Sequence, residues 1–558
     1  MKKPLKNLLV SVGPGYHPGV RLLHGMVKDI SDSRILIFQL EKEMCIDGDL
    51  RLDCGVRHNE FPKAFNLFSE WISEHRFELI GISFMSHHWD IFTELTRIIK
   101  ATLPDCRIIA GGVHAWLINP SETLEHCDYV CAAEGEELYR RLVERLSGLE
   151  PGRPMRIPGL IEKTGNELIR TPISEYMPID NLPIPTIGSR DIYHLYSSRE
   201  KAVFVNEDPL ANSSFSCVHI GRGCPFKCTY CINSLSPEKR NVRVRSVDKT
   251  IAELKMILGL KKIKAFLFMD EIFPLQNDWL KEFAQKYKKE IGIPFVITLY
   301  PGMLTEERAG LLKDAGLKEV SIGIQSGSED IRRDVYKRAG TNSRILEENR
   351  ILSRLGIMTY YDFIIKNPFE TEKDYRESLE LVSKLKRPFY LKLHTLAYYP
   401  RHPITEMALD RKLITEENVS ATIGYLDVTT PHKMAVVDHY QVEESLVYWN
   451  SKMIKDMSRG SVDAPYWLLV SYYGYWYIPK FILDLVKDQY LKGRTAILDI
   501  FNSLIQFTLV IRNNVLSRKI SMMVRMYRQR GLVVLMKKIW MKILRVIKPE
   551  RYGKNPNC

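Results

Sequence analysis

Three of the ten cysteines in this chain lie in one short segment, GRGCPFKCTYCINS (221–234). Cys224, Cys228 and Cys231 give it the spacing C-x3-C-x2-C. Ten cysteines among 558 residues are too few for a disulfide scaffold, and in a reducing compartment closely spaced cysteines bind metal more often than they bridge. The fold must therefore present this segment as a loop that gathers three thiols.

Three thiolates on one loop can bind three irons of a cubane cluster and leave the fourth iron without a protein ligand. That open iron can chelate the amino and carboxylate groups of S-adenosylmethionine, and one electron then cleaves the C5′–S bond to a 5′-deoxyadenosyl radical. A structural zinc site is one alternative; it needs four ligands, and Cys217 or His219 could supply the fourth. A loop of buried, unligated cysteines is another.

The cysteine segment opens a series of apolar strands alternating with helical segments over residues 211–410. Six strands and crossover helices predict a partial (β/α)6 barrel, whose active groups lie at the carboxyl ends of the strands. The expected strands are FSCVHIG, AFLFMD (265–270), FVITLY (295–300), EVSIGIQS (319–326), TYYDFIIKN (359–367) and FYLKLHTLA (389–397).

Residues 1–148 show the same alternation and predict a five-stranded, flavodoxin-like, doubly wound parallel sheet. Its ligand would lie outside the carboxyl ends of the strands. Helical segments such as 92–103 separate the strands. The expected strands are 7–12, 34–40, 79–84, 107–113 and 128–135.

Two further regions follow from composition. Residues 149–210 contain PGRPMRIPG and MPIDNLPIPTIG, whose prolines prevent regular helix, so we predict a connector with a small hairpin at 159–171. Residues 411–558 lose the strand–helix rhythm and predict a helical C-terminal region. Its apolar segment 464–486 falls short of a spanning helix because Lys480, Asp484 and Pro479 interrupt it.

Most of the net charge of +13 lies at the C-terminus. Residues 511–558 carry seven Arg and six Lys against one acid, Glu550, among apolar residues at helical spacing. This predicts a basic amphipathic tail that contacts an anionic membrane surface. One alternative is a helix packed on the protein. The other is an RNA-binding arm, which we do not favour because we expect no nucleic-acid partner.

The cysteine loop resembles that of the radical S-adenosylmethionine (SAM) superfamily, and further segments match its pattern in order. MDEIF (269–273) resembles the segment that binds the methionyl amino group, which implies Asp270 and Glu271. SIGIQSGSE (321–329) resembles the motif near the methionyl carboxylate and ribose, which implies inward-facing Gln325 and Ser326. YDFIIKNPFET (361–371) resembles the segment whose backbone abuts adenine, and Arg338 is expected to reach the carboxylate.

Residues 1–148 resemble the cobalamin-binding domain that precedes many such barrels, through GISFMS (81–86), AGGVHAW (110–116) and AAEGEE (132–137). The resemblance implies that Gly111 and Gly112 let the backbone approach the corrin, with Ser83 and Gly135 nearby. The alternative is a degenerate flavodoxin-like domain that binds nothing.

One departure concerns the cobalt ligand. The family's Asp-x-His-x-x-Gly pattern is missing, because His17 lies in VGPGYHPGV without the matching Asp and Gly. We therefore expect cobalamin to bind base-off without that ligand. His87 and His88 could face the corrin, although a histidine pair at a helix start is usually solvated.

The resemblance implies a cobalamin-dependent radical SAM enzyme that C-methylates, or otherwise radically modifies, an unactivated carbon of a lipid or natural product. Its expected cofactors are a [4Fe–4S] cluster, SAM and cobalamin, and its expected electron donor is reduced flavodoxin or ferredoxin. With no signal peptide in the N-terminal sequence, we expect a cytoplasmic protein, peripheral to the inner face of the membrane through its tail.

Two other functions remain open. A methylthiotransferase acting on tRNA or protein has similar barrel motifs but carries three N-terminal cysteines on a second cluster. Here Cys106, Cys127 and Cys131 fall in or beside strands, at spacings unlike that pattern. A corrin-binding sensor with a decayed barrel is the non-enzymatic alternative, and the intact cysteine triad argues against it.

Overall fold

The computed structural model describes residues 3–420, except 14–17, 41–60, 116–118, 133, 150–155, 165–166, 174–175, 199–200, 212, 237–240, 366 and 387–388. These residues all belong to the first of two compact units into which the chain divides. The expected helical region beyond residue 420, the basic tail and His17 lie outside the described residues. No helix in the described part is long and apolar enough to span a membrane.

The N-terminal part of the chain forms a nine-stranded mixed sheet in the order β7-β6-β5-β4-β3-β1-β2-β8-β9. Its central strands, β2-β1-β3-β4-β5, are parallel and follow the flavodoxin order. The five predicted strands are thus confirmed as β1 (Lys6–Val12), β2 (Asp32–Phe38), β3 (Leu79–Ser83), β4 (Arg107–Gly111) and β5 (Tyr129–Cys131).

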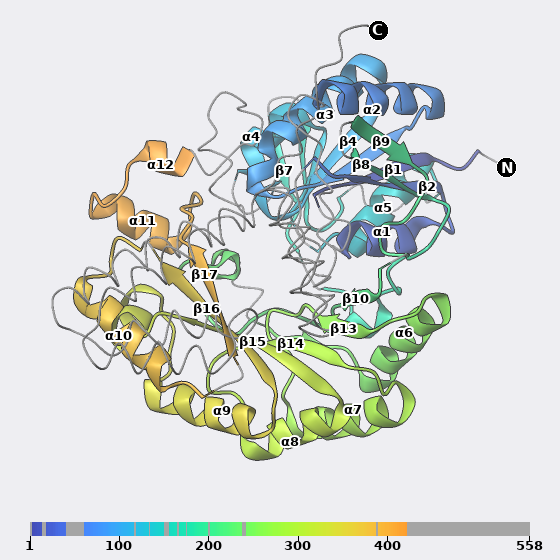
Figure 1. The fold of residues 1–558 in the computed structure, drawn as a ribbon. Coiled ribbons are helices and arrows are strands. Elements are labelled where there is room, and N and C mark those ends of the chain that lie inside the picture. Colours follow the sequence, from blue (N-terminus) through green and yellow to red (C-terminus); the bar gives the residue numbers. More distant parts are fainter. Residues whose placement is uncertain are drawn as a thin grey trace, which may run out of the picture. The chain divides into compact units, whose positions relative to one another are not determined.

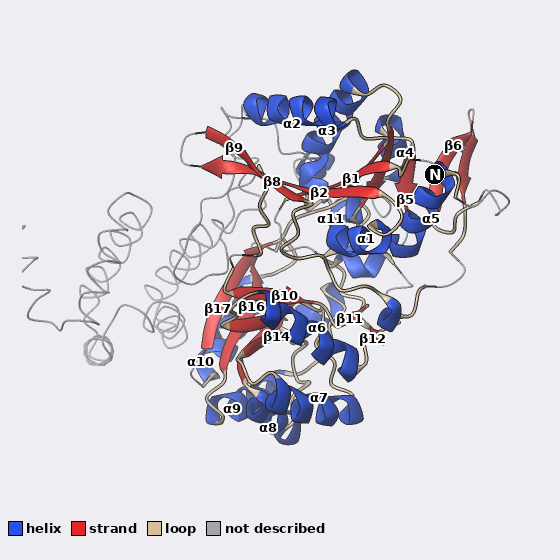
Figure 2. Cartoon of the chain, turned by 90° about the vertical axis from the view of Figure 1, so that its right-hand side faces the viewer, coloured by secondary structure: helices blue, strands red, loops and turns tan. Residues whose placement is uncertain are grey.

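Helices cover both faces of this sheet because its strands are apolar on both sides. Figure 2 shows the sheet edge-on, with α2 and α3 on one side and α1 and α5 on the other. Phe68 and Phe92 belong to the core under α2 and α3, and Val20 and Leu138 to the core under α1 and α5. The helices are α1 (Gly19–Val27), α2 (Phe61–His75), α3 (Trp89–Thr102), α4 (Pro120–His126) and α5 (Gly135–Ser147).

The prediction that 149–210 is only a connector is wrong. The expected hairpin exists as β6 (Leu160–Thr164) and β7 (Glu167–Arg170), but it extends the sheet beyond β5. At the other edge, β8 (Ile192–Ser198) pairs in parallel with β2, and β9 (Lys201–Val205) pairs antiparallel with β8. The prolines fall between these strands, which is why they do not prevent them.

A buried ion pair fixes the end of this added segment. Arg21 on α1 donates through both terminal nitrogens to Asp208, at 2.9 and 2.7 Å, and both side chains are 1% exposed. Asp208 also accepts hydrogen bonds from the backbone amides of Gly188 and Leu210. The segment that follows β9 is therefore tied to α1, so the N-terminal unit of structure extends to about residue 208.

The second sheet is parallel and has six strands in sequential order. Figure 1 shows its helices lined along one side of the fan of strands. The six expected barrel strands are confirmed as β10 (Phe215–Val218), β13 (Ala265–Phe268), β14 (Phe295–Leu299), β15 (Leu317–Gln325), β16 (Met358–Ile365) and β17 (Phe389–Thr395).

Polar caps set the starts of the crossover helices. The side chains of Ser246, Thr305 and Thr341 each accept a hydrogen bond from a backbone amide of the first turn, and Gly316 ends α8 at φ +117°. The helices are α6 (Val247–Leu260), α7 (Asn277–Glu290), α8 (Glu306–Ala315), α9 (Asn342–Arg354) and α10 (Glu372–Lys384), followed by α11 (Pro403–Asp410) and α12 (Glu416–Ser420).

Candidate active site

The cysteine loop follows β11 (Gly221–Arg222), which pairs antiparallel with β12 (Arg243–Val244). Thr229, in the middle of the loop, donates from its amide to Tyr336 O at 3.1 Å and from its hydroxyl to Val335 O at 2.7 Å. The amide of Cys231 donates to Cys228 O at 3.0 Å. These bonds hold the loop against the segment that follows β15.

The three predicted cysteines form no disulfide bond and lie near one another. Cys228 is buried, and Cys224 and Cys231 are half-buried. Burial is the main cause that raises the pKa of Cys224 to about 11, and the neighbouring thiols Cys231 and Cys228 contribute to this rise. A loop that clusters thiols and makes their ionisation costly is suited to a cationic metal centre, which binds the thiolate form.

Arg338 supplies a positive charge to this loop. Its Nη1 donates to Cys228 Sγ at 3.3 Å and to Tyr230 Oη at 3.2 Å, and its Nη2 donates to Gly323 O. The guanidinium also lies over the ring of Tyr300, 4.0 Å from its centroid. Arg338, expected to reach a cofactor carboxylate, is thus buried at the cysteine loop, and contact with a carboxylate remains a prediction.

Within the described residues, no group of three or more His, Cys, Asp or Glu side chains is arranged to hold a single metal ion. A cubane cluster has a different requirement, because each thiolate binds its own iron. Cys217, considered as a fourth zinc ligand, lies on β10, and burial raises its pKa to about 11.

Asp270 lies immediately beyond β13 and is buried. Its Oδ1 accepts hydrogen bonds from the amides of Ile220 and Gly221, at 2.9 and 2.6 Å, so it fixes the chain that leads into the cysteine loop. Its Oδ2 is buried without a hydrogen-bond partner. Burial raises the pKa of Asp270 to about 7. Glu271 beside it is exposed.

Gln325 is the last residue of β15, and Ser326 follows it. The two side chains lie in different environments. Gln325 has a positive φ of 72° at an irregularity in the pairing with β16, and its side chain folds over Gly323. Ser326 is buried, and its hydroxyl donates to Glu370 Oε1 at 2.6 Å. Its hydroxyl is thus occupied by the loop after β16; a role toward a cofactor remains a prediction.

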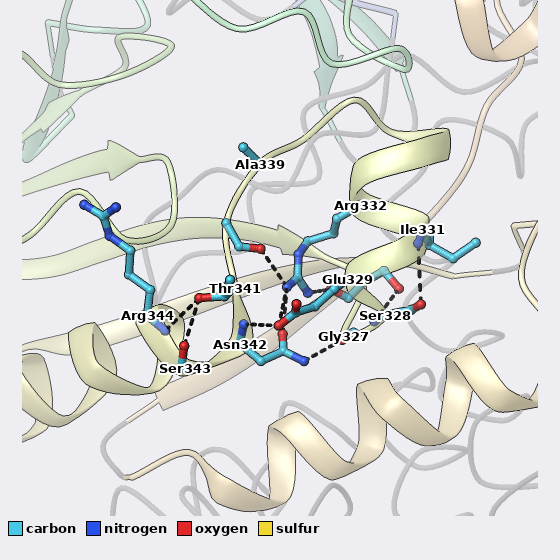
Figure 3. Close-up of polar contacts among 12 residues, drawn as sticks. Gly327, Ser328, Glu329, Ile331, Arg332, Ala339, Thr341, Asn342, Ser343 and Arg344 are labelled. Atoms are coloured by element: carbon cyan, nitrogen blue, oxygen red, sulfur yellow. Dashed lines mark hydrogen bonds and ion pairs between the residues drawn. The ribbon is translucent and has the colours of Figure 1, made fainter.

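A polar network, which the sequence did not reveal, fixes the segment from Ser326 to α9 (Figure 3). Arg332 is fully buried and donates to Ser326 O, to Gly340 O at 3.1 Å and to Asn342 Oδ1 at 2.7 Å. Asn342 in turn donates from Nδ2 to Gly327 O at 2.8 Å. Because Arg338 lies within this segment, the network holds it in place at the cysteine loop.

The N-terminal site residues gather where the strands of the first sheet end. Ser83 is the last residue of β3 and pairs with Gly111, the last residue of β4. Gly112 has φ +92°, and a Cβ there would fall 2.4 Å from Phe84 O. Gly135 begins α5. These residues therefore lie at the carboxyl ends of the parallel strands, where a doubly wound sheet binds its ligand.

The sequence led us to expect that His87 and His88 are solvated, but the structure buries both. A Cβ on Gly13 would lie 2.8 Å from His88 Cε1, so the ring occupies the space that Gly13 leaves. His114 of the AGGVHAW segment was missed. It is buried against Trp89, and burial lowers its pKa to about 4, so it is neutral at physiological pH.

Arg222, two residues before Cys224, contacts the carboxylates that flank Gly135. It forms ion pairs with Glu134 at 2.7 Å and with Glu136 at 2.5 Å, and Arg243 also pairs with Glu134. The matched segment AAEGEE is thus joined directly to the strand that precedes the cysteine loop.

Two family models match the chain. Residues 218–382 match the radical SAM superfamily, and residues 53–143 match the B12 binding domain. The first range contains the cysteine loop, Asp270 and Arg338, and the second contains Ser83, Gly111 and Gly135.

The chain is also similar to individual proteins. An uncharacterized methyltransferase of Pyrococcus horikoshii is 26% identical over 447 residues, which cover 79% of this chain and 87% of that protein. The structure of the methyltransferase TsrM from Kitasatospora setae, with cobalamin and a [4Fe–4S] cluster bound, aligns with a TM-score of 0.55 and 16% identity, covering 73% of this chain and 78% of that one. The cobalamin-dependent SAM radical enzyme OxsB aligns with a TM-score of 0.53 and 17% identity, over 79% and 62%. At these identities the structural likeness shows a shared fold.

The fold and the family matches define the chain as a radical SAM enzyme. It carries a B12-binding domain ahead of the radical SAM domain, and its cofactors are a [4Fe–4S] cluster, SAM and cobalamin.

Proposed function

We propose that this enzyme C-methylates an unactivated carbon of a natural product or lipid. The proposal rests on one observation: the chain contains both a B12-binding domain and a radical SAM domain. The relative in Pyrococcus horikoshii, which is named a methyltransferase, supports it. When bound, the cluster and SAM would supply the radical that removes a hydrogen atom, and cobalamin would supply the methyl group.

We assign the cluster to Cys224, Cys228 and Cys231. The three cysteines lie on one loop, and Arg338 donates a hydrogen bond to Cys228 Sγ. A nearby cation offsets the negative charge that three thiolates bring to the centre. The loop is held by Thr229 and needs little rearrangement to keep its cysteines together.

We assign the methionyl ammonium of SAM to Asp270, with Glu271 beside it. The Oδ2 of Asp270 is a buried acceptor without a partner, and a charged ammonium would satisfy it with a charge-assisted hydrogen bond. Gln325, Ser326 and Arg338 complete the proposed SAM site at the adjoining strand end. The strand ends with Ser83, Gly111 and Gly112, together with Gly135 at the start of α5, are the proposed corrin-binding surface.

Anaerobic reconstitution tests this assignment. The wild-type protein should bind about four irons with matching sulfide and turn brown, and a Cys224→Ala, Cys228→Ala, Cys231→Ala triple variant should bind none. A Cys106→Ala variant is the control, because Cys106 is buried in the first sheet. Stoichiometric zinc without sulfide would contradict the assignment. Transfer of label from [methyl-14C]SAM to an acceptor then tests methylation itself.

We further propose that reduced flavodoxin or ferredoxin donates the electron and that the basic tail, residues 511–558, contacts anionic membranes. The tail lies outside the described residues, so its support is its charge and apolar spacing. Full-length protein should co-sediment with anionic vesicles at low salt, and protein truncated after residue 510 should not. A full-length protein that stays in the supernatant would overturn the membrane proposal.

A further inference from the structure

We propose that Asp362 and His394 form a substrate-recognition pair on the open face of the six-stranded sheet, and that the substrate presents a hydroxyl or amine hydrogen to it. The inference rests on the proposed methyl transfer and narrows its acceptor. It favours a polar natural product over a hydrocarbon chain.

Side chains on β15 and β16 alternate between two environments. Val320, Ile322 and Phe363 are buried, and Tyr361 packs toward Asn349 of α9, so this set faces the helices. The intervening residues, Glu319, Ser321, Tyr360 and Asp362, therefore face the other side, which we call the open face. Lys392 and His394 of β17 join them there through their contacts.

Asp362 orients His394. Its Oδ1 lies 3.0 Å from His394 Nε2, and its Oδ2 accepts a hydrogen bond of 2.9 Å from Ser321 Oγ. Because a carboxylate only accepts, Nε2 must carry a hydrogen, which leaves Nδ1 of the neutral ring as an acceptor. The His394 side chain is 41% exposed, whereas that of Asp362 is 19% exposed. The pair thus offers an oriented acceptor to an incoming molecule.

Lys392 adds a cation to the same face. Its Nζ lies 3.4 Å from Ser321 Oγ and 4.7 Å from the centroid of the Tyr360 ring. The patch thus combines the acceptor nitrogen of His394, the hydroxyl of Ser321 and the ammonium of Lys392. This combination suits a substrate that carries both a protic group and an acidic group. A hydrocarbon chain would instead desolvate these polar groups without offering them a hydrogen bond, which is costly.

The pair lies next to the proposed reaction centre. Asp362 is the register partner of Gly323 on β15, and Gly323 O accepts a hydrogen bond from Arg338, which also contacts Cys228. The side chains of Gln325 and Arg338 cover Gly323. The open face therefore begins one strand from the arginine that contacts the cysteine loop.

The experiment follows label from [methyl-14C]SAM. Reconstituted full-length enzyme with cobalamin and reductant is given, separately, the aqueous-methanol and the chloroform extracts of cells that carry the gene. We expect label in a water-soluble product. Label only in the chloroform-soluble product would overturn the polar substrate while leaving methyl transfer standing. Label in neither, with 5′-deoxyadenosine still formed, would contradict the proposed methyl transfer and this inference with it.

Variants then test the residues. His394→Phe and Asp362→Asn should each lower label transfer at least tenfold, with uncoupled formation of 5′-deoxyadenosine within twofold of wild type. Asp314→Asn, at an exposed site on α8, is the matched control and should change neither. Iron content and circular dichroism verify that each variant folds. Lys392→Met, which removes an exposed cation, should raise the apparent KM for the methyl acceptor. Unchanged transfer by folded His394→Phe and Asp362→Asn proteins would overturn the assignment.

Discussion

The guanidinium of Arg338 donates a hydrogen bond to the sulfur of Cys228 at 3.3 Å. If Cys228 ligates the cluster, as proposed, this buried cation would stabilise the more negative, reduced state of the cluster. Arg338 is itself held by a loop whose polar contacts start at Arg332 and Asn342. The electrostatic setting of the cluster therefore depends on the loop after β15 as well as on the cysteine loop.

Replacement of Arg338 by glutamine should lower the reduction potential of the reconstituted cluster. The positive charge is lost, and the expected shift is on the order of 60 mV, which equals a tenfold change for a one-electron couple. A redox titration monitored by electron paramagnetic resonance measures it. Arg333→Gln, at a side chain that is 63% exposed, is the control and should leave the potential unchanged. An unchanged potential in Arg338→Gln protein would mean that the contact does not reach the cluster.

The pH dependence of SAM binding should report Asp270. Burial raises the pKa of this carboxyl to about 7, and an ammonium group prefers the ionised form. The Kd should therefore decrease as the pH rises from about 6 to 7, by up to about tenfold per unit, and level off above 7. Isothermal titration calorimetry should find this slope in wild-type and Glu271→Gln protein and a flat profile in Asp270→Asn. A slope retained in Asp270→Asn would assign it to another group.

The same carboxyl should affect stability in the cofactor-free protein. Its folded pKa lies above the ordinary value of 3.8, so the folded state holds a proton that the unfolded chain releases. The contribution is fully present below about pH 4 and is lost as the pH rises to about 7. Urea unfolding between pH 5.5 and 7.5 should show a decline in the free energy of unfolding that is shallower in Asp270→Asn.

Gly112→Ala should destabilise the first sheet strongly. The new Cβ would lie 2.4 Å from Phe84 O at a φ of +92°, so the backbone itself must move, at about 3 kcal/mol or more. Gly259→Ala is the matched control: that glycine lies in α6 with no atom within 4 Å of the new Cβ, and a gain of up to about 1 kcal/mol is expected. Equal unfolding midpoints for the two variants would refute the close approach.

The ion pair of Arg222 with Glu136 should show measurable coupling. A double-mutant cycle with Arg222→Gln and Glu136→Gln should give about 1–3 kcal/mol, because Glu136 is only 7% exposed. The exposed pair Arg97–Glu94 on α3 is the matched cycle and should give less than about 0.5 kcal/mol. Equal coupling in the two cycles would show that the Arg222 contact contributes no more than a surface pair.

The boundary of the B12-binding domain can be tested with two fragments. Residues 1–148 lack β6 to β9 and Asp208, whereas residues 1–210 keep all nine strands and the Arg21–Asp208 pair. We propose the boundary near residue 210 and expect only the longer fragment to fold and to bind hydroxocobalamin base-off. Equal binding by the shorter fragment would show that the added strands are dispensable.

The sequence predicted the strands that are buried on both faces. It also predicted the cysteine loop, because the C-x3-C-x2-C spacing indicates a metal-binding segment. The added strands β8 and β9 were missed because β8 mixes polar and apolar residues and the pair follows a proline-rich segment. Their pairing with β2 is a contact between distant parts of the chain that local pattern does not encode.

The contacts of the site were harder to predict than its residues. The cysteine triad was found, but the contact of Arg338 with Cys228 depends on how the loop after β15 folds back. Asp362 and His394 carried a readable signal, since Ser321, Tyr360, Asp362, Lys392 and His394 are polar residues at every second position of otherwise apolar strands. Ion pairs such as Arg222–Glu134 join segments 88 residues apart, and charge pattern alone does not pair them.

The place of β8 in the first sheet has a consequence for synthesis on the ribosome. The free edge of β2 is complete at Phe38, but its neighbour β8 begins only at Ile192. At about 5–20 residues per second, roughly 10–30 s pass before that edge can be covered. During this interval the nascent chain exposes an unpaired apolar strand, so this edge is where chaperone protection would matter most.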